Sequence, residues 1–281
     1  MVHCYIRRQS WGADGLTERR KRLGLGEALR MTAVGLRRSW SEAWGAIVLG
    51  VLVWGARPFV VHGVSAWIWT GVAIVATLVL IGALARVAAS ADAAHARRLG
   101  LGRTGLQLTK VEARLFGAGL LCSVFLAMVL SVAALLLLAL FGGAGLDAEA
   151  IRLGDWSRVG PAWKLGLLAV MTAFCIFAIV ALTARLLLFA PATVARGHMI
   201  SLNSMALTRG IFWPFMAGLI VTAAPKVGLL ILTGAGLLPG AAGWVVWVVV
   251  LIGLQGPLTM AYLGAVYRRI EPGTLQGFPH G

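Results

Sequence analysis

Two interrupted apolar stretches near the C-terminal end hold the residues whose types and spacing could do chemistry. Lys226 follows Pro225 inside one stretch, and Gln255-Gly256-Pro257 interrupts the next one shortly before Thr259. Proline frees backbone carbonyls because it lacks an N–H, and interrupted adjacent helices mark midplane binding sites in transporters. An ammonium there would hold an anionic headgroup or a carboxylate. The pattern therefore predicts a candidate ligand site at Lys226, Gln255 and Thr259.

A second interpretation of the same residues needs no ligand. Lys226 lies about 20 Å along the helix from Trp213 at 1.5 Å per residue, and its long side chain can extend outward to reach water. The two prolines then only kink their helices, as prolines do in membrane segments. Both interpretations stay open at this stage.

Catalytic and metal-binding patterns are weak elsewhere in the chain. The Gly100–Gly105 segment spells GxGxxG, but it lies in a basic loop, whereas a dinucleotide site needs a preceding strand and a following helix. The ten acidic residues lie almost entirely outside the apolar stretches, and no GxSxG occurs. Neither the five histidines nor the three cysteines show ligand spacing: His3, His62, His95, His198, His280, Cys4, Cys122 and Cys175. We expect a non-enzymatic protein with no cofactor and no metal.

The composition indicates that lipid is the solvent for most side chains. The chain has 281 residues, of which 59% are hydrophobic and 12% charged, against about a quarter charged in soluble domains. A membrane helix needs about 20 apolar residues, and only helices and closed barrels satisfy their backbone in lipid. We predict an all-α polytopic fold with six spans, at about 43–61, 64–85, 115–141, 165–189, 211–236 and 242–267. Arg57-Pro58 makes the first span the weakest.

The basic residues orient these spans. Twenty Lys and Arg lie before span 1, between spans 2 and 3, between spans 4 and 5, and after span 6, whereas the opposite loops hold four. The positive-inside rule places both termini in the cytoplasm and the chain in a bacterial inner membrane. The net charge of +15 then reflects topology and attraction to anionic lipids, not nucleic-acid binding. The expected regions are a basic segment 1–42 without a cleavable signal, a membrane domain 43–267, and a tail 268–281.

An internal repeat organises the spans. Residues 85–121 align without gaps to 184–220 at an offset of 99, with 12 of 37 positions identical. The matches include Arg86 with Arg185, and both segments run from an arginine ending a span, through a short basic helix, into the next span. We therefore predict three helical hairpins, each preceded by a short cytoplasmic interfacial helix and all entering from the same side.

The interfacial helices have an amphipathic pattern suited to the membrane surface. Residues 27–40 place apolar side chains near one face, while the arginines can reach lipid phosphates. In the last repeat an arginine and a tryptophan stand at the headgroup level before span 5. The residues expected at the lipid headgroups are Arg37, Arg38, Arg86, Arg185, Arg209 and Trp213.

The last repeat also resembles a known signature. An arginine that ends a helix, an Ala-Pro pair, and a later Leu-Thr-Arg-Gly before aromatic residues appear in the segments 185–197 and 204–213. This pattern is similar to uncharacterised, alphaproteobacterial-type membrane proteins grouped with the membrane domain of glycerophosphoryl diester phosphodiesterase. The resemblance covers about thirty residues well and implies a membrane module without an active site. The chemistry of that family belongs to a separate soluble domain, for which this chain has no room.

These observations favour a lipid-interacting module or an accessory subunit of a membrane complex. The alternative is a small-molecule or lipid transporter with its site at the interruptions of spans 5 and 6. Membrane lipids are the expected partners, and small residues on the spans permit close contact with a membrane-protein partner or a second copy.

Overall fold

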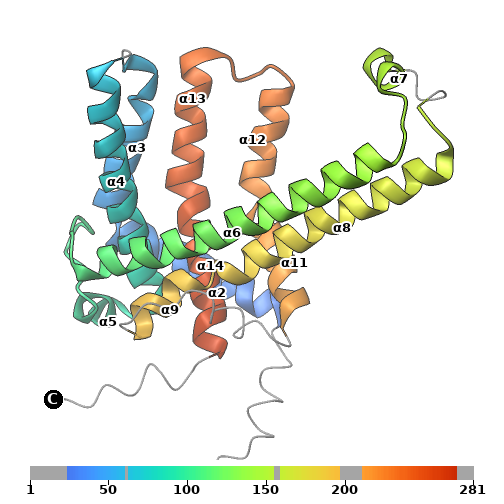
Figure 1. The fold of residues 1–281 in the computed structure, drawn as a ribbon. Coiled ribbons are helices and arrows are strands. Elements are labelled where there is room, and N and C mark those ends of the chain that lie inside the picture. The colour runs from blue at the N-terminus through green and yellow to red at the C-terminus, as the bar shows by residue number, and fades with distance from the viewer. Residues whose placement is uncertain (1–23, 61–62, 155–158, 197–210, 271–281) are drawn as a thin grey trace, which may run out of the picture.

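The computed structural model describes residues 24–60, 63–154, 159–196 and 211–270, and within these ranges it contains helices and no strand. The predicted all-α class is confirmed. The helices are labelled in Figure 1, and their bounds are α2 Leu25–Glu42, α3 Trp44–Gly55, η1 Arg57–Phe59, α4 Val64–Ala89, α5 Ala93–Arg98, α6 Lys110–Gly143, α7 Ala148–Leu153, α8 Ala162–Leu186, α9 Phe189–Arg196, α11 Phe212–Thr222, α12 Ala224–Gly234, α13 Gly240–Val248, the π-helix η2 Val249–Gln255, and α14 Gly256–Ile270.

Four of these helical stretches are long and apolar enough to cross a membrane: α4, α6, α8 with α9, and the continuous run from α13 to α14. A fifth crossing is available if α11 and α12, which meet at an angle of 45°, form one bent span. The bend falls beside Pro225, so the predicted interruption of this stretch is confirmed. These helices indicate a membrane protein.

The first predicted span, 43–61, is shorter in the structure than expected. The α3 helix has 12 residues, which rise about 18 Å, whereas a hydrocarbon core is about 30 Å thick. Arg57-Pro58 forms the 3-10 turn η1 directly after it, because proline lacks an N–H and clashes with the preceding helical turn. A sixth span is therefore not confirmed: the apolar helical segment here runs only from Trp44 to Phe59, and the residue pair that shortens it was visible in the sequence.

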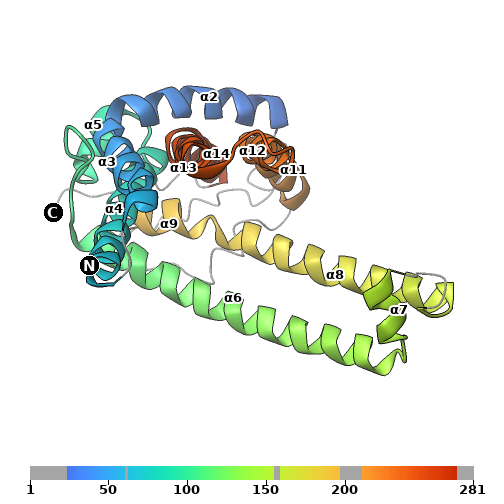
Figure 2. The same cartoon turned by 90° about the horizontal axis from the view of Figure 1, so that it is seen from above.

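Figure 1 shows how the elements are arranged in space. The α3–α4 and α12–α13 connections lie at one end of the molecule, whereas α2, α5, α9 and the last turns of α14 lie at the opposite end. The antiparallel α6 and α8 helices, which we call the α6–α8 pair, slant across this arrangement and carry α7 at their far end. Seen from above, they extend away from the other helices (Figure 2).

The packed core lies at the end that holds α2, α5 and α9. Its three clusters of buried side chains come from α2, α4, α9, α11 and α14 together with the ends of their neighbours, and Met260 packs against all three. The α4 helix illustrates the asymmetry, because its last eleven residues, from Val79 to Ala89, are almost all buried whereas its first turns are exposed. Burial of apolar surface therefore stabilises one end, and the helices separate toward the other.

The α2 helix packs on α14 through small side chains. Its buried face consists of Ala28, Thr32 and Ser39, with Gly35 on the same face. A methyl group added at Gly35 would come within 3.0 Å of the Ala261 Cβ. Val34 and Trp40, two apolar residues of the helix that the sequence assigns to the membrane surface, are 67% and 46% exposed, so they lie outside the protein core. The contact with α14 is made by small residues at spacings of three and four, which permit close helix packing.

Tryptophan side chains link the helices at the other end. The Trp54 indole donates to Thr77 Oγ1 at 3.0 Å, and Trp69 donates to the Val53 carbonyl at 3.0 Å. From α13, Trp244 donates to the carbonyl of Trp54 at 2.8 Å. An indole N–H surrounded by apolar groups is costly unless it finds an acceptor. These bonds therefore connect α3, α4 and α13 where little side-chain burial does so.

Candidate functional site

Arg86 and Glu112 form a buried ion pair between the last turns of α4 and the first turn of α6. Arg86 is 0% exposed and Glu112 is 2% exposed. The guanidinium donates from both terminal nitrogens to the carboxylate, from Nη2 to Thr109 Oγ1 at 2.8 Å, and from Nε to the Leu99 carbonyl at 3.0 Å. Gly82 leaves room for the carboxylate, since an added Cβ there would overlap it.

Local sequence chemistry positions this acid. Thr109 is the N-cap of α6, its side chain accepts from Val111 N, and Glu112 accepts from the backbone N–H of Thr109 at 2.7 Å. This capping box has the recognisable Thr-x-x-Glu spacing, a signal that sequence reasoning overlooked. The structure does not support the predicted headgroup contact at Arg86, because every donor group of this buried side chain is directed to protein.

Two further arginines close the end of α4. Arg38 donates to the Ser90 carbonyl at 3.1 Å and to its hydroxyl at 2.7 Å, and it pairs with Glu42 at 2.6 Å. Arg268, from α14, donates to the carbonyls of Ala88 at 2.5 Å and Ser90 at 3.2 Å. Cations at a helix C-terminus are favoured by the helix dipole and satisfy free carbonyls. Arg38 is thus engaged by protein, whereas Arg37, on the same helix, is exposed.

The neighbouring α5 helix carries His95. Asp92 caps α5 by accepting from the backbone N–H of His95 at 2.6 Å, and this bond lowers the pKa of its carboxyl. Partial burial, followed by repulsion from Arg98, lowers the pKa of His95. The imidazole is therefore favoured in its neutral form, in which Nδ1 faces the Ala91 N–H.

Arg185 and Trp213 lie together where α8 passes α11. The Arg185 guanidinium stacks over the Phe212 ring at 4.8 Å, and Trp213 stacks on Phe177 at 6.1 Å. Trp213 is 70% exposed, and its predicted place at the lipid headgroups stays a prediction. Arg209, the remaining residue expected at the headgroups, lies outside the described residues.

The predicted ligand site is only partly brought together. Gln255 donates from Nε2 to Thr259 Oγ1 at 3.0 Å, while its Oε1 is buried without a partner. Lys226 is exposed on α12, and none of the described residues forms a hydrogen bond or an ion pair with it. The predicted break at Gln255-Gly256-Pro257 was wrong: the helix continues, and its type changes from π to α at Gly256.

The π-helix has its own anchor. Trp40, on α2, donates its indole N–H to the carbonyl of Gly253 at 2.6 Å. A π-helical turn displaces backbone carbonyls from their usual intrahelical partners, and such turns are frequent at functional sites. The Gly253 carbonyl is such an acceptor, and its bond with Trp40 joins α2 to the middle of the helical run from α13 to α14, close in sequence to the partly buried Gln255.

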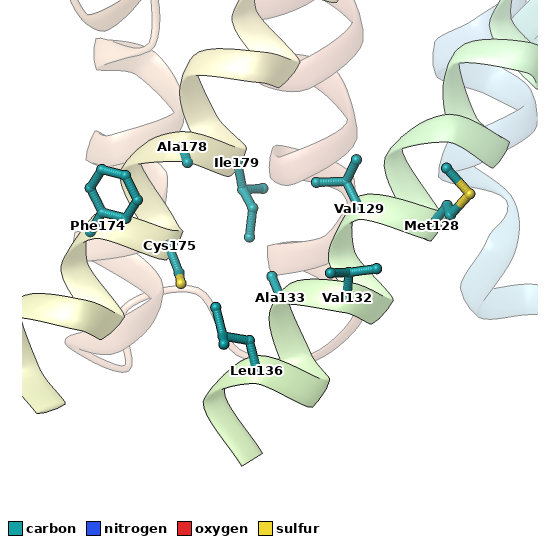
Figure 3. A pocket seen from close by; sticks show the side chains of 9 residues that line it. All are labelled: Met128, Val129, Val132, Ala133, Leu136, Phe174, Cys175, Ala178 and Ile179. Atoms are coloured by element: carbon teal, nitrogen blue, oxygen red, sulfur yellow. The ribbon is translucent and has the colours of Figure 1, made fainter. Parts of the chain in front are cut away.

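An apolar groove runs between the two helices of the α6–α8 pair (Figure 3). It encloses about 290 Å³ and is lined entirely by apolar side chains: Met128, Val129, Val132, Ala133, Leu136, Phe174, Cys175, Ala178 and Ile179. The most apolar stretch of α6 is not buried inside the protein at all. Only 11% of the most apolar stretch of α8 with α9 is buried. In water such a surface would be strongly unfavourable, so this pair requires an apolar environment.

Comparisons with known proteins give no relative: no family model, no curated protein and no solved structure matches this chain. Within the described ranges, no three His, Cys, Asp or Glu side chains gather as metal ligands do.

Replacing Glu112 with glutamine should destabilise the protein strongly, because Arg86 would keep its charge without a counter-ion in a buried position. Breaking such a pair from one side costs about 3–5 kcal/mol, and SDS titration in mixed micelles would measure the loss. The control is Glu149→Gln, whose exposed pair with Arg152 contributes about 0–1 kcal/mol. Equal effects of the two substitutions would show that the buried pair is not important for stability.

Proposed function

We propose that this protein is a non-enzymatic integral membrane protein of a bacterial inner membrane, acting as a lipid-interacting module or an accessory subunit of a membrane complex. The observation that carries this proposal is the exposed apolar surface of the α6–α8 pair. The most apolar stretch of α6 is 0% buried, and the groove between the two helices is lined by no polar side chain. A hydrocarbon surface of this kind accommodates acyl chains or apolar helices. The described polar side chains, by contrast, bond mainly to protein groups, either within one helix or between neighbouring helices.

The proposed topology has six crossings in three parallel hairpins, with both termini in the cytoplasm. The short helices α5 and α9 share one end of the molecule with α2, and α2 and α5 carry the basic residues Arg30, Arg37, Arg38, Arg97 and Arg98, which supports a cytoplasmic position for this end. Arg86 and Arg185 each stand in the last turn of a long helix, α4 and α8, which supports the proposed repeat. The short helix that the repeat predicts at 202–209 lies outside the described residues. The first crossing, from Trp44 to Phe59, rises about 24 Å and would require local thinning of the bilayer.

Topology reporters test this arrangement directly. A reporter fused after Gly281 and one inserted near Gly102 should both report the cytoplasm, whereas one inserted near Asp155 should report the periplasm. The twenty-to-four distribution of basic residues is the physical reason. A cytoplasmic signal near Asp155 would contradict the six-crossing topology and the repeat with it.

The proposed function itself is tested by isolation in a native-like bilayer. The tagged protein, extracted directly into nanodiscs from its own membrane, should retain a defined set of phospholipids or a stoichiometric membrane-protein partner, both identifiable by mass spectrometry. An unrelated six-span protein of known function, extracted in parallel, controls for bulk lipid. Retention of neither lipid nor partner above this control would contradict the proposal.

A transporter is the second candidate, favoured by the 45° bend at α12 and by the π-helix that packs beside it. In that case Lys226→Met should abolish binding of an anionic solute while the protein still inserts. If the protein is a lipid-interacting module, Lys226→Met should cause no loss. Insertion scales assign a cost of about 2.5–3.5 kcal/mol to a charge at a helix centre, so the variant should be as stable as the wild type or more stable. Urea unfolding in detergent and solute uptake by proteoliposomes distinguish the two outcomes.

A further inference from the structure

Lys226 is a single charge in a long apolar part of the chain. Between Arg209 and Arg268 the sequence holds no other Lys, Arg, Asp or Glu. Lys226 lies in the first turn of α12, directly after the bend from α11. Along the helix it is about 21 Å from Phe212 and about 12 Å from Gly234, so it stands well inside the bent span. An ionisable residue inside a membrane segment is costly and is therefore a candidate for a functional contact.

The side chain of Lys226 belongs to an exposed and otherwise apolar surface of α12. The helix buries Leu229 against its neighbours. Lys226 and Leu230, by contrast, are both exposed, and residues four apart share one face of a helix. Ile231, the next residue along the helix, is 66% exposed. The ammonium is therefore presented outward from this helix among apolar side chains.

The chain itself provides no carboxylate at this depth. Residues 43–91, 113–146 and 156–270, which hold the apolar helices, contain no Asp or Glu. A second copy of the chain would therefore bring apolar surface but no counter-charge to the middle of the membrane. The nearer end of α12 is about 12 Å away along the helix, a distance longer than a lysine side chain. The sequence thus leaves the counter-charge of Lys226 to another molecule.

We propose that the exposed face of α12 binds a transmembrane helix of a different protein, and that this helix carries an Asp or Glu that pairs with Lys226. Charge complementarity selects this occupant, because ionisable residues within membrane segments pair with one another and the low dielectric strengthens their attraction. Leu230 and Ile231 provide the apolar contact beside the pair. An apolar helix without the acid would leave the ammonium uncompensated, so the pair also gives specificity. This inference rests on the accessory-subunit role in the proposed function and names the chemistry of the partner.

Synthetic transmembrane peptides test the contact in phosphatidylcholine vesicles that contain the full-length protein, with fluorescence energy transfer as the measure of binding. Three leucine–alanine peptides differ only in their central residue, which is Glu, Gln or Leu. The wild type should bind the Glu peptide about tenfold more tightly than the Leu peptide, as polar contacts between model membrane helices do, and the Gln peptide with intermediate affinity. Lys226→Met should remove this preference, whereas Lys226→Arg should keep it.

Lys110→Met, which removes an exposed lysine from the first turn of α6, is the matched control and should keep the preference of the wild type. Equal binding of the three peptides by the wild type, or a Glu preference that survives Lys226→Met, would overturn the contact. A thermal midpoint of Lys226→Met below that of the wild type would assign the lysine to the fold and overturn it too. A preference that disappears when phosphatidylglycerol is added to the vesicles would assign Lys226 to a lipid phosphate.

Extraction from the protein's own membrane identifies the partner. The tagged wild type in nanodiscs should retain a protein with an Asp or Glu in a membrane segment, and Lys226→Met should lose it. Reversal of both charges, with Lys226→Glu and the partner's acid replaced by lysine, should restore the complex. Retention of lipids without such a partner overturns this inference alone, whereas retention of neither contradicts the proposed function as well.

Discussion

The buried contact between Arg86 and Glu112 is the constraint on which the rest of the structure depends. A fully enclosed charge pair is tolerated only when each partner is present and hydrogen-bonded, and here Thr109 and the Leu99 carbonyl complete the set. The pair therefore joins the end of α4, the loop after α5 and the beginning of α6 in a single arrangement. The packed core forms at this end, and Arg38 and Arg268 close the same end of α4 from α2 and α14.

The two ends of the molecule are held together by different physical means. At the core end, small residues bring backbones close, and Gly218 is an instance, because an added Cβ would overlap the Tyr262 ring. Tyr262 uses that approach to donate to the Phe215 carbonyl at 3.0 Å. At the other end, indole hydrogen bonds connect helices whose side chains are mostly exposed. Lipid exerts little hydrophobic force between helices, so directional bonds and close packing replace it.

The α6–α8 pair stands apart from both modes of packing, which is why it dominates the functional interpretation. Its apolar groove provides no hydrogen-bonding group, while the charged and aromatic side chains gather at the end of the pair near α9 and α11.

The sequence by itself determined the helical class, the long apolar helices and the bend beside Pro225. These properties depend on local composition, segment length and the missing N–H of proline, which are readable without a fold. Only the tertiary structure decided which face of α2 is buried, that Arg86 is enclosed, and that the helix continues through Pro257 after a π-turn. Those outcomes depend on the partner that each side chain meets: Ala261 opposite Gly35, Glu112 opposite Arg86, and Trp40 opposite the Gly253 carbonyl. Contacts between residues far apart in the chain leave little trace in local pattern, so a capping box was visible whereas the buried arginine that it serves was not.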